Sequence, residues 1–171
     1  MRTPRAGISI KPISRRYHGD GFHCGKQDFN QYLQAALSST RRTERIYVAL
    51  DESKSIVGFY ALSACSIEFD DEDYTQGILH PYFAARIMVL AVDRCMTDQG
   101  IARLLLGHAL HMIYNVVADN QLDIDIVLCD TPDTRAKAFY LHYGFIALPG
   151  MQKAVFLPLR SLDKLIQPLA C

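Results

Sequence analysis

The chain has 171 residues, half of them apolar, and its 18 basic side chains balance 18 acidic ones. Because no Pro/Gly/Ser-rich linker or internal repeat divides it, residues 1–171 are expected to form a single domain with a sizeable core. The five scattered cysteines argue against a disulfide framework, and the absence of a signal peptide or of an apolar stretch approaching about 20 residues predicts a cytoplasmic protein without a membrane span.

The neutral net charge hides an asymmetry along the chain. Residues 1–45 contain nine Lys/Arg against three Asp/Glu, whereas residues 46–171 contain nine against fifteen. Clustered basic side chains attract nucleic-acid phosphates without regard to base sequence, although they also occur on ordinary solvated helix faces. The candidate RNA contacts are Arg15, Arg16, Arg41, Arg42 and Arg45.

The first half of the chain alternates short apolar strands with one helix. Hydrophobic periodicity predicts a strand at 8–13, a helix at 26–38, and strands at 46–50 and 56–67 joined by a tight turn at 51–55. The acidic run at 68–73 follows as an exposed loop that could instead attract a cationic substrate or a basic partner.

The second half opens with a strand at 87–92, whose continuous apolar character predicts a central position buried on both faces. A helix at 100–117 follows, with Leu104, Leu105, His108, Ala109, Met112 and Val116 on its expected apolar face. A strand at 124–129, a helix at 134–143, a hairpin of 146–148 with 155–157 and a terminal helix at 159–166 complete the chain. This is a mixed α/β order of strands and helices.

The junction between the strand at 87–92 and the helix at 100–117 is suited to a phosphate-bearing cofactor. The first turn of a helix offers backbone N–H groups and the positive end of the helix dipole, and small residues at Gly100 and Ala102 let an anion approach. Many α/β proteins have such a glycine for packing reasons alone, so both interpretations remain open.

Two segments together resemble the GCN5-related N-acetyltransferase (GNAT) family. That family has a strand ending in Leu-Ala-Val-Asp, a pyrophosphate loop of the form Gln/Arg-x-x-Gly-x-Gly/Ala, and a later Phe-Tyr-x-x-x-Gly-Phe. Here 90–93 read LAVD, 97–102 read TDQGIA and 139–145 read FYLHYGF. Thr97 replaces the usual Gln or Arg of the loop.

The resemblance is closer still to the GNAT toxins of bacterial type II toxin–antitoxin modules. Those proteins have an N-terminal Phe-x-Cys-Gly, a Leu-Asp-x-Tyr-Leu-like helix and a Val-Gly-Tyr-Tyr-x-Leu-Ser-like strand, and this chain has FHCG at 22–25, FNQYL at 29–33 and VGFYALS at 57–63. The similarity covers residues 21–145, and the combination is more specific than any one motif.

The resemblance implies an α/β fold of the GNAT type, with a central mixed β-sheet flanked by helices, and acetyl-CoA as cofactor. The strand backbone would pair with the pantetheine arm and the loop amides would hold the pyrophosphate. Asp98 stands where these toxins commonly have Gly, and a carboxylate facing the pyrophosphate would weaken binding. The expected cofactor-binding residues are Leu90, Ala91, Val92, Thr97, Gln99, Gly100, Ile101, Ala102 and Arg103.

Tyr140 is the catalytic residue that the resemblance implies, because the family places this hydroxyl near the thioester sulfur, where it can protonate the departing thiolate. The alternative is a core aromatic. The amide of Ala91 or Val92 could polarise the thioester carbonyl, whereas no general base can be assigned. His108 and His111 lack further ligands at suitable spacing, so no metal site is expected.

The resemblance therefore implies an acetyl-CoA-dependent N-acetyltransferase, toxin-like, that acetylates the α-amino group of aminoacyl-tRNA and blocks translation. A homodimer and a ribbon-helix-helix antitoxin partner come with the same resemblance. One alternative is an acetyltransferase for protein N-termini or small amines, which the neutral net charge favours. Another is a catalytically inactive GNAT-fold binding or regulatory module, which the departures at Thr97 and Asp98 keep open.

Overall fold

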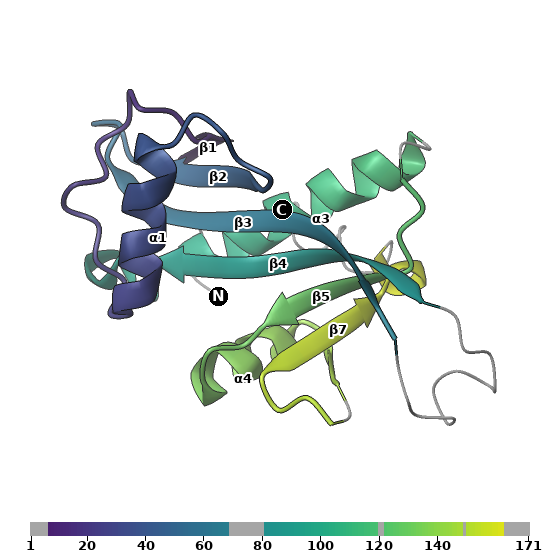
Figure 1. Cartoon of the computed structure of the whole chain (residues 1–171). Helices are drawn as coiled ribbons and strands as arrows, with labels where there is room; N and C mark the ends of the chain where they lie inside the picture. Colours follow the sequence, from purple (N-terminus) through teal and green to yellow (C-terminus); the bar gives the residue numbers. More distant parts are fainter. Residues whose placement is uncertain (1–6, 69–80, 120–121, 149, 163–171) are drawn as a thin grey trace. The chain divides into compact units, whose positions relative to one another are not determined.

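The computed structural model describes residues 7–68, 81–119, 122–148 and 150–162 (Figure 1). It contains a seven-stranded sheet of order β1-β2-β3-β4-β5-β7-β6. Strands β4 and β5 pair in parallel, whereas the β1–β2, β2–β3, β5–β7 and β6–β7 pairs are antiparallel. The predicted mixed sheet with flanking helices is confirmed. The chain divides into two compact units, residues 1–62 with 89–109 and residues 63–88 with 110–171.

The first unit holds the N-terminal strands, one complete helix and parts of three longer elements. Its complete elements are β1 (Ser9–Pro12), α1 (Gln27–Ser38), β2 (Arg45–Leu50) and the 3₁₀ helix η1 (Arg94–Met96). It shares β3 (Ile56–Ile67), β4 (Tyr82–Val92) and α3 (Ile101–Ala118) with the second unit. The predicted turn between β2 and β3 forms because Asp51 accepts hydrogen bonds from the N–H groups of Ser53 and Ser55, both at 2.9 Å.

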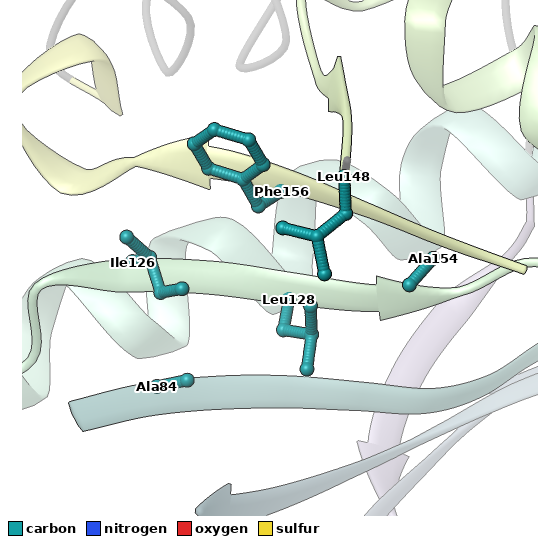
Figure 2. Packing of buried hydrophobic residues seen from close by; sticks show 6 residues of the cluster. All are labelled: Ala84, Ile126, Leu128, Leu148, Ala154 and Phe156. Atoms are coloured by element: carbon teal, nitrogen blue, oxygen red, sulfur yellow. The ribbon is translucent and has the colours of Figure 1, made fainter. Parts of the chain in front are cut away.

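The second unit is built around β5 (Ile126–Asp130), α4 (Thr134–His142), β6 (Ile146–Ala147) and β7 (Ala154–Pro158). Side chains alternate between the two faces of a strand, and on one face of β5 Ile126 and Leu128 pack against Leu148 and Phe156, with Ala84 and Ala154 completing the cluster in Figure 2. The predicted strand, helix and closing hairpin of this region are confirmed. Val127 and Cys129, which alternate with Ile126 and Leu128 along β5, lie on the other face of this strand.

Helix α3 forms where predicted, but its buried face differs from the expected one. Leu105 and Ala109 are buried as predicted, whereas Leu104, His108, Met112 and Val116 are only partly buried. The remaining buried positions are Ile101, Leu106, Leu110 and Ile113. Apolar residues occur all round this helix, so periodicity alone does not select the face. Helix α3 is long and apolar enough to cross a membrane by length and composition alone. The core helices of soluble proteins meet the same criteria.

Three further expectations need adjustment. Strand β4 begins at Tyr82 rather than 87, and its burial alternates along the strand rather than being complete on both faces. Strand β5 begins at Ile126 rather than 124. Of the predicted terminal helix, the 3₁₀ helix η2 (Leu159–Ser161) is described, and 163–166 lie outside the described residues. So does most of the acidic run, from residue 69 onward.

Candidate functional site

Asp93 organises the junction after β4. One of its carboxylate oxygens accepts a hydrogen bond from the N–H of Cys95 and the other from the N–H of His23, each at 2.9 Å. The N–H of Arg94 donates to the carbonyl of His23 at 3.0 Å. The first contact caps η1, and the other two attach the loop containing His23 to the junction. The FHCG motif and the LAVD motif are therefore physically connected.

The loop that follows η1 reaches α3 through two left-handed residues. Thr97 donates its hydroxyl proton to the carbonyl of Arg94 at 2.9 Å, so its side chain closes this turn locally. Asp98 has φ of 62° and Gly100 has φ of 79°. Glycine adopts this conformation freely, and aspartate does so more readily than most other residues. Position 98 therefore requires a residue that tolerates a left-handed backbone, as Asp does here.

Helix α3 begins directly after this loop. The N–H of Leu104 donates to the carbonyl of Gly100 at 3.0 Å, which makes Gly100 the N-cap residue. The N–H groups ahead of that bond, including those of Ile101 and Ala102, have no acceptor within the helix itself. No acidic residue lies in the first turn. Amides, helix dipole and the absence of a carboxylate in that turn together fit a bound pyrophosphate.

Gly58 lets α3 approach the sheet at this end. A Cβ atom at Gly58 would lie 2.9 Å from Leu105 Cδ1, 3.1 Å from the carbonyl oxygen of Ala91 and 3.2 Å from Ile101 Cγ2. A backbone atom yields less easily than a flexible side chain, so a Cβ atom here would require the Ala91 carbonyl to shift by a few tenths of an ångström. Gly58 thus fixes the start of α3 against β3 and β4.

Strand β4 extends beyond its ladder with β5. That ladder runs from the Ala84–Ile126 pair to the Ile87–Cys129 pair, and β4 continues to Val92. A strand that outruns its neighbour offers backbone groups to an extended ligand. All nine predicted cofactor-binding residues, from Leu90 to Arg103, belong to the first unit; three lie at the end of β4 and six in the loop-to-helix junction.

Tyr140 lies on α4 in the second unit and is 3% exposed. Asp133 caps α4 by accepting a hydrogen bond from the N–H of Ala136 at 2.8 Å. After the helix, Gly144 at φ of 86° turns the chain back, so that the N–H of Phe145 donates to the carbonyl of Tyr140 at 3.2 Å and the two rings lie 5.3 Å apart. The FYxxxGF motif is thus a device that fixes Tyr140.

The thiol of Cys129 on β5 is completely buried and interacts with Tyr140. Burial raises the pKa of Tyr140 well above its usual value, and the neighbouring Cys129 raises it further. Burial likewise raises the pKa of the Cys129 thiol. Both groups are therefore neutral at physiological pH, and Tyr140 keeps the proton that a general acid needs.

A partly exposed ion pair lies next to Cys129 in the chain. Arg86 on β4 binds Asp130 with its Nε at 3.0 and 3.1 Å from the two carboxylate oxygens and one Nη at 2.6 Å. Such a forked pair fixes both side chains, although partial exposure limits what it contributes to stability. It connects β4 to the residue that follows Cys129. Sequence reasoning missed both this pair and Cys129.

The five predicted RNA-binding arginines differ in what they contact. Arg15 donates to the carbonyl of Ser38 at 2.6 Å. Arg42 donates to the carbonyl of Ala36 at 2.6 and 3.1 Å and to that of Ser39 at 3.0 Å. These two guanidinium groups satisfy the carbonyls at the C-terminal end of α1, where positive charge is also favoured by the helix dipole. The side chains of Arg16, Arg41 and Arg45 are exposed.

An open groove of about 410 Å³ runs along α1 in the first unit. Two amides build its wall: Asn30 accepts a hydrogen bond from the N–H of Cys24 at 2.9 Å, and Gln34 donates to the carbonyl of Gly19 at 2.7 Å. The lining residues are Asp20, Phe22, His23, Gln27, Asn30, Gln31 and Gln34. Since His23 is bonded to Asp93, the groove adjoins the loop described above. The sequence analysis did not find it.

His108 and His111 have different surroundings. The Nδ1 atom of His108 lies 2.6 Å from the hydroxyl of Tyr60, and His111 is exposed. Within the described part of the chain no group of three or more His, Cys, Asp or Glu side chains could hold a metal ion. The cysteines described there, Cys24, Cys65, Cys95 and Cys129, form no disulfide with one another.

Comparison with known protein families identifies the family. The model of the acetyltransferase (GNAT) domain matches residues 42–147, more than half of the chain. The chain belongs to this family. Its members transfer an acetyl group from acetyl-CoA to an amine, so this GNAT protein is an N-acetyltransferase with acetyl-CoA as acyl donor.

Its relatives include toxins. The chain is similar to the probable toxin TacT of Sinorhizobium fredii, with 26% identity over 96% of this chain and 98% of TacT. In fold it resembles a Tyr-to-Phe variant of KacT, with a TM-score of 0.81 and 22% identity over 93% of this chain and 99% of KacT. It also resembles AtaT complexed with acetyl-methionyl-tRNAfMet, with a TM-score of 0.79 and 22% identity over 92% and 98% of the two chains.

Proposed function

We propose that this GNAT protein is a toxin that acetylates the α-amino group of aminoacyl-tRNA and thereby blocks translation. The observation that carries the proposal is the junction of β4 with α3, in which Gly100 caps a helix whose first turn has no acidic side chain. This junction supports pyrophosphate binding in a chain whose relatives are toxins. The acceptor is inferred from AtaT, which has been solved with acetyl-methionyl-tRNAfMet.

In the proposed complex the chain binds acetyl-CoA, which supplies an activated acetyl thioester. The backbone of Leu90, Ala91 and Val92 pairs with the pantetheine arm as an added strand, and the amide of Ala91 or Val92 polarises the thioester carbonyl. The amides of residues 99–103 hold the pyrophosphate. Thr97 contributes through its backbone turn, since its hydroxyl is engaged with Arg94.

Tyr140 acts as general acid in this proposal. As the acceptor amine attacks and the carbon–sulfur bond breaks, Tyr140 donates its phenolic proton to the departing sulfur. Its raised pKa keeps that proton in place at physiological pH. The attacking amine loses its own proton to water.

The exposed side chains of Arg16, Arg41 and Arg45 support an RNA acceptor, because Arg16 follows Arg15 and Arg41 precedes Arg42 in the chain, and Arg15 and Arg42 bind carbonyls at the C-terminal end of α1. We place the acceptor end in the neighbouring α1 groove, whose neutral amides suit a nucleobase or an aminoacyl group better than a phosphate. By analogy with AtaT, which has been solved bound to the C-terminus of the antitoxin AtaR, we expect an antitoxin partner. A homodimer, a single-domain organisation and a cytoplasmic location are part of the same proposal.

The neutral net charge of the chain favours a second candidate, transfer to protein N-termini or small amines. A charged-tRNA substrate and an amine substrate differ in salt dependence, because counterion release accompanies phosphate binding. Acetylation of aminoacyl-tRNA that falls steeply with salt would support the toxin. Equal rates on a free amino acid amide at all salt concentrations would support the second candidate.

The first test is calorimetric titration with acetyl-CoA followed by an assay on charged tRNA. Wild type and Tyr140→Phe are expected to bind acetyl-CoA equally in the micromolar range, and Tyr140→Phe to lose acetyl transfer. Tyr143→Phe, which changes a partly buried tyrosine at the end of the same helix, should retain activity. Absence of acetyl-CoA binding would reject the enzyme and favour a regulatory module, and full activity of Tyr140→Phe would reject the catalytic role.

A further inference from the structure

His23 lies where the α1 groove meets the end of β4. Its N–H donates to the carboxylate of Asp93 at 2.9 Å, and its carbonyl accepts a hydrogen bond from the N–H of Arg94 at 3.0 Å. Asp93 directly follows β4, the strand whose last amides are proposed to polarise the thioester carbonyl. Both bonds use main-chain atoms of His23. The backbone therefore sets the position of His23 beside β4, while the residue lines the groove.

The imidazole of His23 has one nitrogen that is used within the fold. Nδ1 accepts a hydrogen bond from the N–H of Gly25 at 3.3 Å. A nitrogen that accepts carries a lone pair, so the proton of the neutral ring is on Nε2. The imidazolium also has a proton on Nε2. This atom is therefore a donor in both protonation states, and it has no partner among the residues that the structure describes.

The other polar groups that line the groove are amides and one carboxylate. Asn30 and Gln34 each use one amide atom to bind the backbone of the N-terminal loop. Asp20 supplies a negative charge, and the described lining residues include neither Lys nor Arg. Such a groove disfavours phosphate and suits a neutral or cationic group. The aminoacyl end of a charged tRNA is a group of this kind, because it has a neutral ester carbonyl and an α-ammonium.

From this geometry we infer that His23 is a substrate-binding residue, whose Nε2–H donates a hydrogen bond to the carbonyl oxygen of the aminoacyl ester. The inference rests on the proposed function and deepens it. One carbon atom separates this carbonyl from the α-amine, so a donor that holds the oxygen also places the amine beside the end of β4. His23 does not act as the base in this arrangement, because Nε2 already carries a proton.

Substitutions of His23 separate hydrogen bonding from packing. His23→Gln retains an N–H donor, whereas His23→Leu and His23→Met fill space without one. Loss of one hydrogen bond corresponds to roughly a 3- to 10-fold change in an equilibrium or rate constant. The KM for charged tRNA should rise by about that factor in the Leu and Met proteins, and Gln should restore most of it. The ester carbonyl is not the reacting group, so kcat should stay within about twofold of wild type.

Two controls show whether the effect is local. His18→Leu removes an exposed histidine that does not line the groove and should keep the wild-type KM. Acetyl-CoA titration should give the wild-type Kd in every protein, because the main-chain bonds of His23 to Asp93 and Arg94 do not depend on its side chain. Thermal unfolding identifies any variant that fails to fold, and the Leu and Met proteins replace each other in that case.

The salt dependence of KM provides a readout that distinguishes a carbonyl contact from a phosphate contact. A bond to a neutral carbonyl releases no counterions, so His23→Leu should leave the slope of log KM against log salt unchanged. The Arg16→Ala, Arg41→Ala and Arg45→Ala triple variant should reduce that slope. The two kinds of variant therefore test different parts of the same complex.

Each outcome decides between these statements. If the wild-type protein does not acetylate charged tRNA, the proposed function fails and the role of His23 fails with it. If the wild-type protein acetylates charged tRNA while His23→Leu and His23→Met keep its KM, the role of His23 alone is overturned. An equal rise in KM for the Gln and Leu proteins, a loss confined to kcat, or a smaller salt slope in His23→Leu would also overturn it.

Discussion

Asp93 accepts a hydrogen bond from the N–H of His23, at 2.9 Å and across 70 residues of chain. The same carboxylate caps η1 at the entrance to the expected pyrophosphate loop. A single side chain thus attaches the N-terminal loop and α1 groove to the end of β4. The position of the proposed acceptor groove and the shape of the proposed cofactor loop therefore depend on the same residue.

Asp93→Ala should disturb both. Removing two hydrogen bonds to a charged acceptor is expected to destabilise the protein by about 2–4 kcal/mol and to raise the Kd for acetyl-CoA several-fold. Urea denaturation and calorimetry measure the two effects. Asp51→Ala is the matched control, since Asp51 also accepts two backbone bonds but in the β2–β3 turn. It should affect stability alone, and equal loss of acetyl-CoA affinity in both variants would contradict the assignment.

Asp98 is predicted to weaken acetyl-CoA binding through its charge. Asp98→Asn retains a residue that tolerates φ of 62° and removes the carboxylate, so the Kd should fall about two- to fivefold at low salt. The difference should shrink as salt screens the interaction. Asp98→Gly should behave likewise, and Asp28→Asn, a charge change on α1, is the control. A Kd that is unchanged in both Asp98 variants at low salt would contradict this prediction.

The basic cluster should separate into two groups of variants. Arg15→Ala and Arg42→Ala remove donors to the carbonyls of α1 and should lower the free energy of unfolding by about 0.5–1.5 kcal/mol each. Arg16→Ala, Arg41→Ala and Arg45→Ala should leave stability unchanged and reduce both activity on charged tRNA and its salt dependence. Arg160→Ala, outside this cluster, is the control. Unchanged salt dependence in the triple variant would remove the RNA footprint.

The protein should lose stability at alkaline pH. Cys129, Tyr60 and Tyr140 are neutral in the folded state with raised pKa values, each caused first by burial. A raised folded pKa gives stability that is complete below the unfolded pKa and is lost as pH rises above it, from about 8.5 for the thiol and about 10 for the phenols. Each group contributes a slope of about 1.4 kcal/mol per pH unit.

Urea denaturation from pH 7 to 10.5 tests this, with Cys129→Ser and Tyr60→Phe as the informative variants. Cys129→Ser should flatten the decline between about pH 8.5 and 10, and Tyr60→Phe should reduce only the steeper decline above that window. A wild-type unfolding free energy that is constant up to pH 10.5 would contradict the buried neutral state of all three groups.

The single-domain organisation of residues 1–171 stays a prediction. Strands β3 and β4 and helix α3 each run through both compact units, so unfolding of one unit should disrupt elements of the other. Far-ultraviolet circular dichroism and tyrosine fluorescence should therefore report one coincident transition in urea. Two separated transitions would show that the units are independent.

The sequence predicted most elements because turn and cap residues delimit them. Asp51 and Asp133 form the turn and the cap that their positions suggest. Helix α3 shows where this reasoning stops: with apolar residues on every side, only tertiary packing decides that Leu106 and Leu110 are buried.

The candidate site was predictable to the extent that it consists of motifs. The loop around Gly100 and the position of Tyr140 follow from short patterns. Cys129 lies on β5, however, and a turn and the first part of α4 separate it from Tyr140 in the chain. No spacing rule predicts that these two side chains interact. Nor could the sequence show that Arg15 and Arg42 are used within the fold, because carbonyl groups leave no mark on the identity of the residues that carry them.

Gly58 has a consequence for how this protein tolerates change. Its missing side chain sets the separation between a carbonyl on one strand and the helix whose first amides are expected to hold the pyrophosphate. Adding one methyl group there is expected to weaken the binding of acetyl-CoA, although Gly58 is not proposed to contact it. A random mutagenesis screen is accordingly expected to recover inactive variants at position 58 as well as in the loop. Gly58 would then be mistaken for a residue that contacts the cofactor, although its role is to set a spacing.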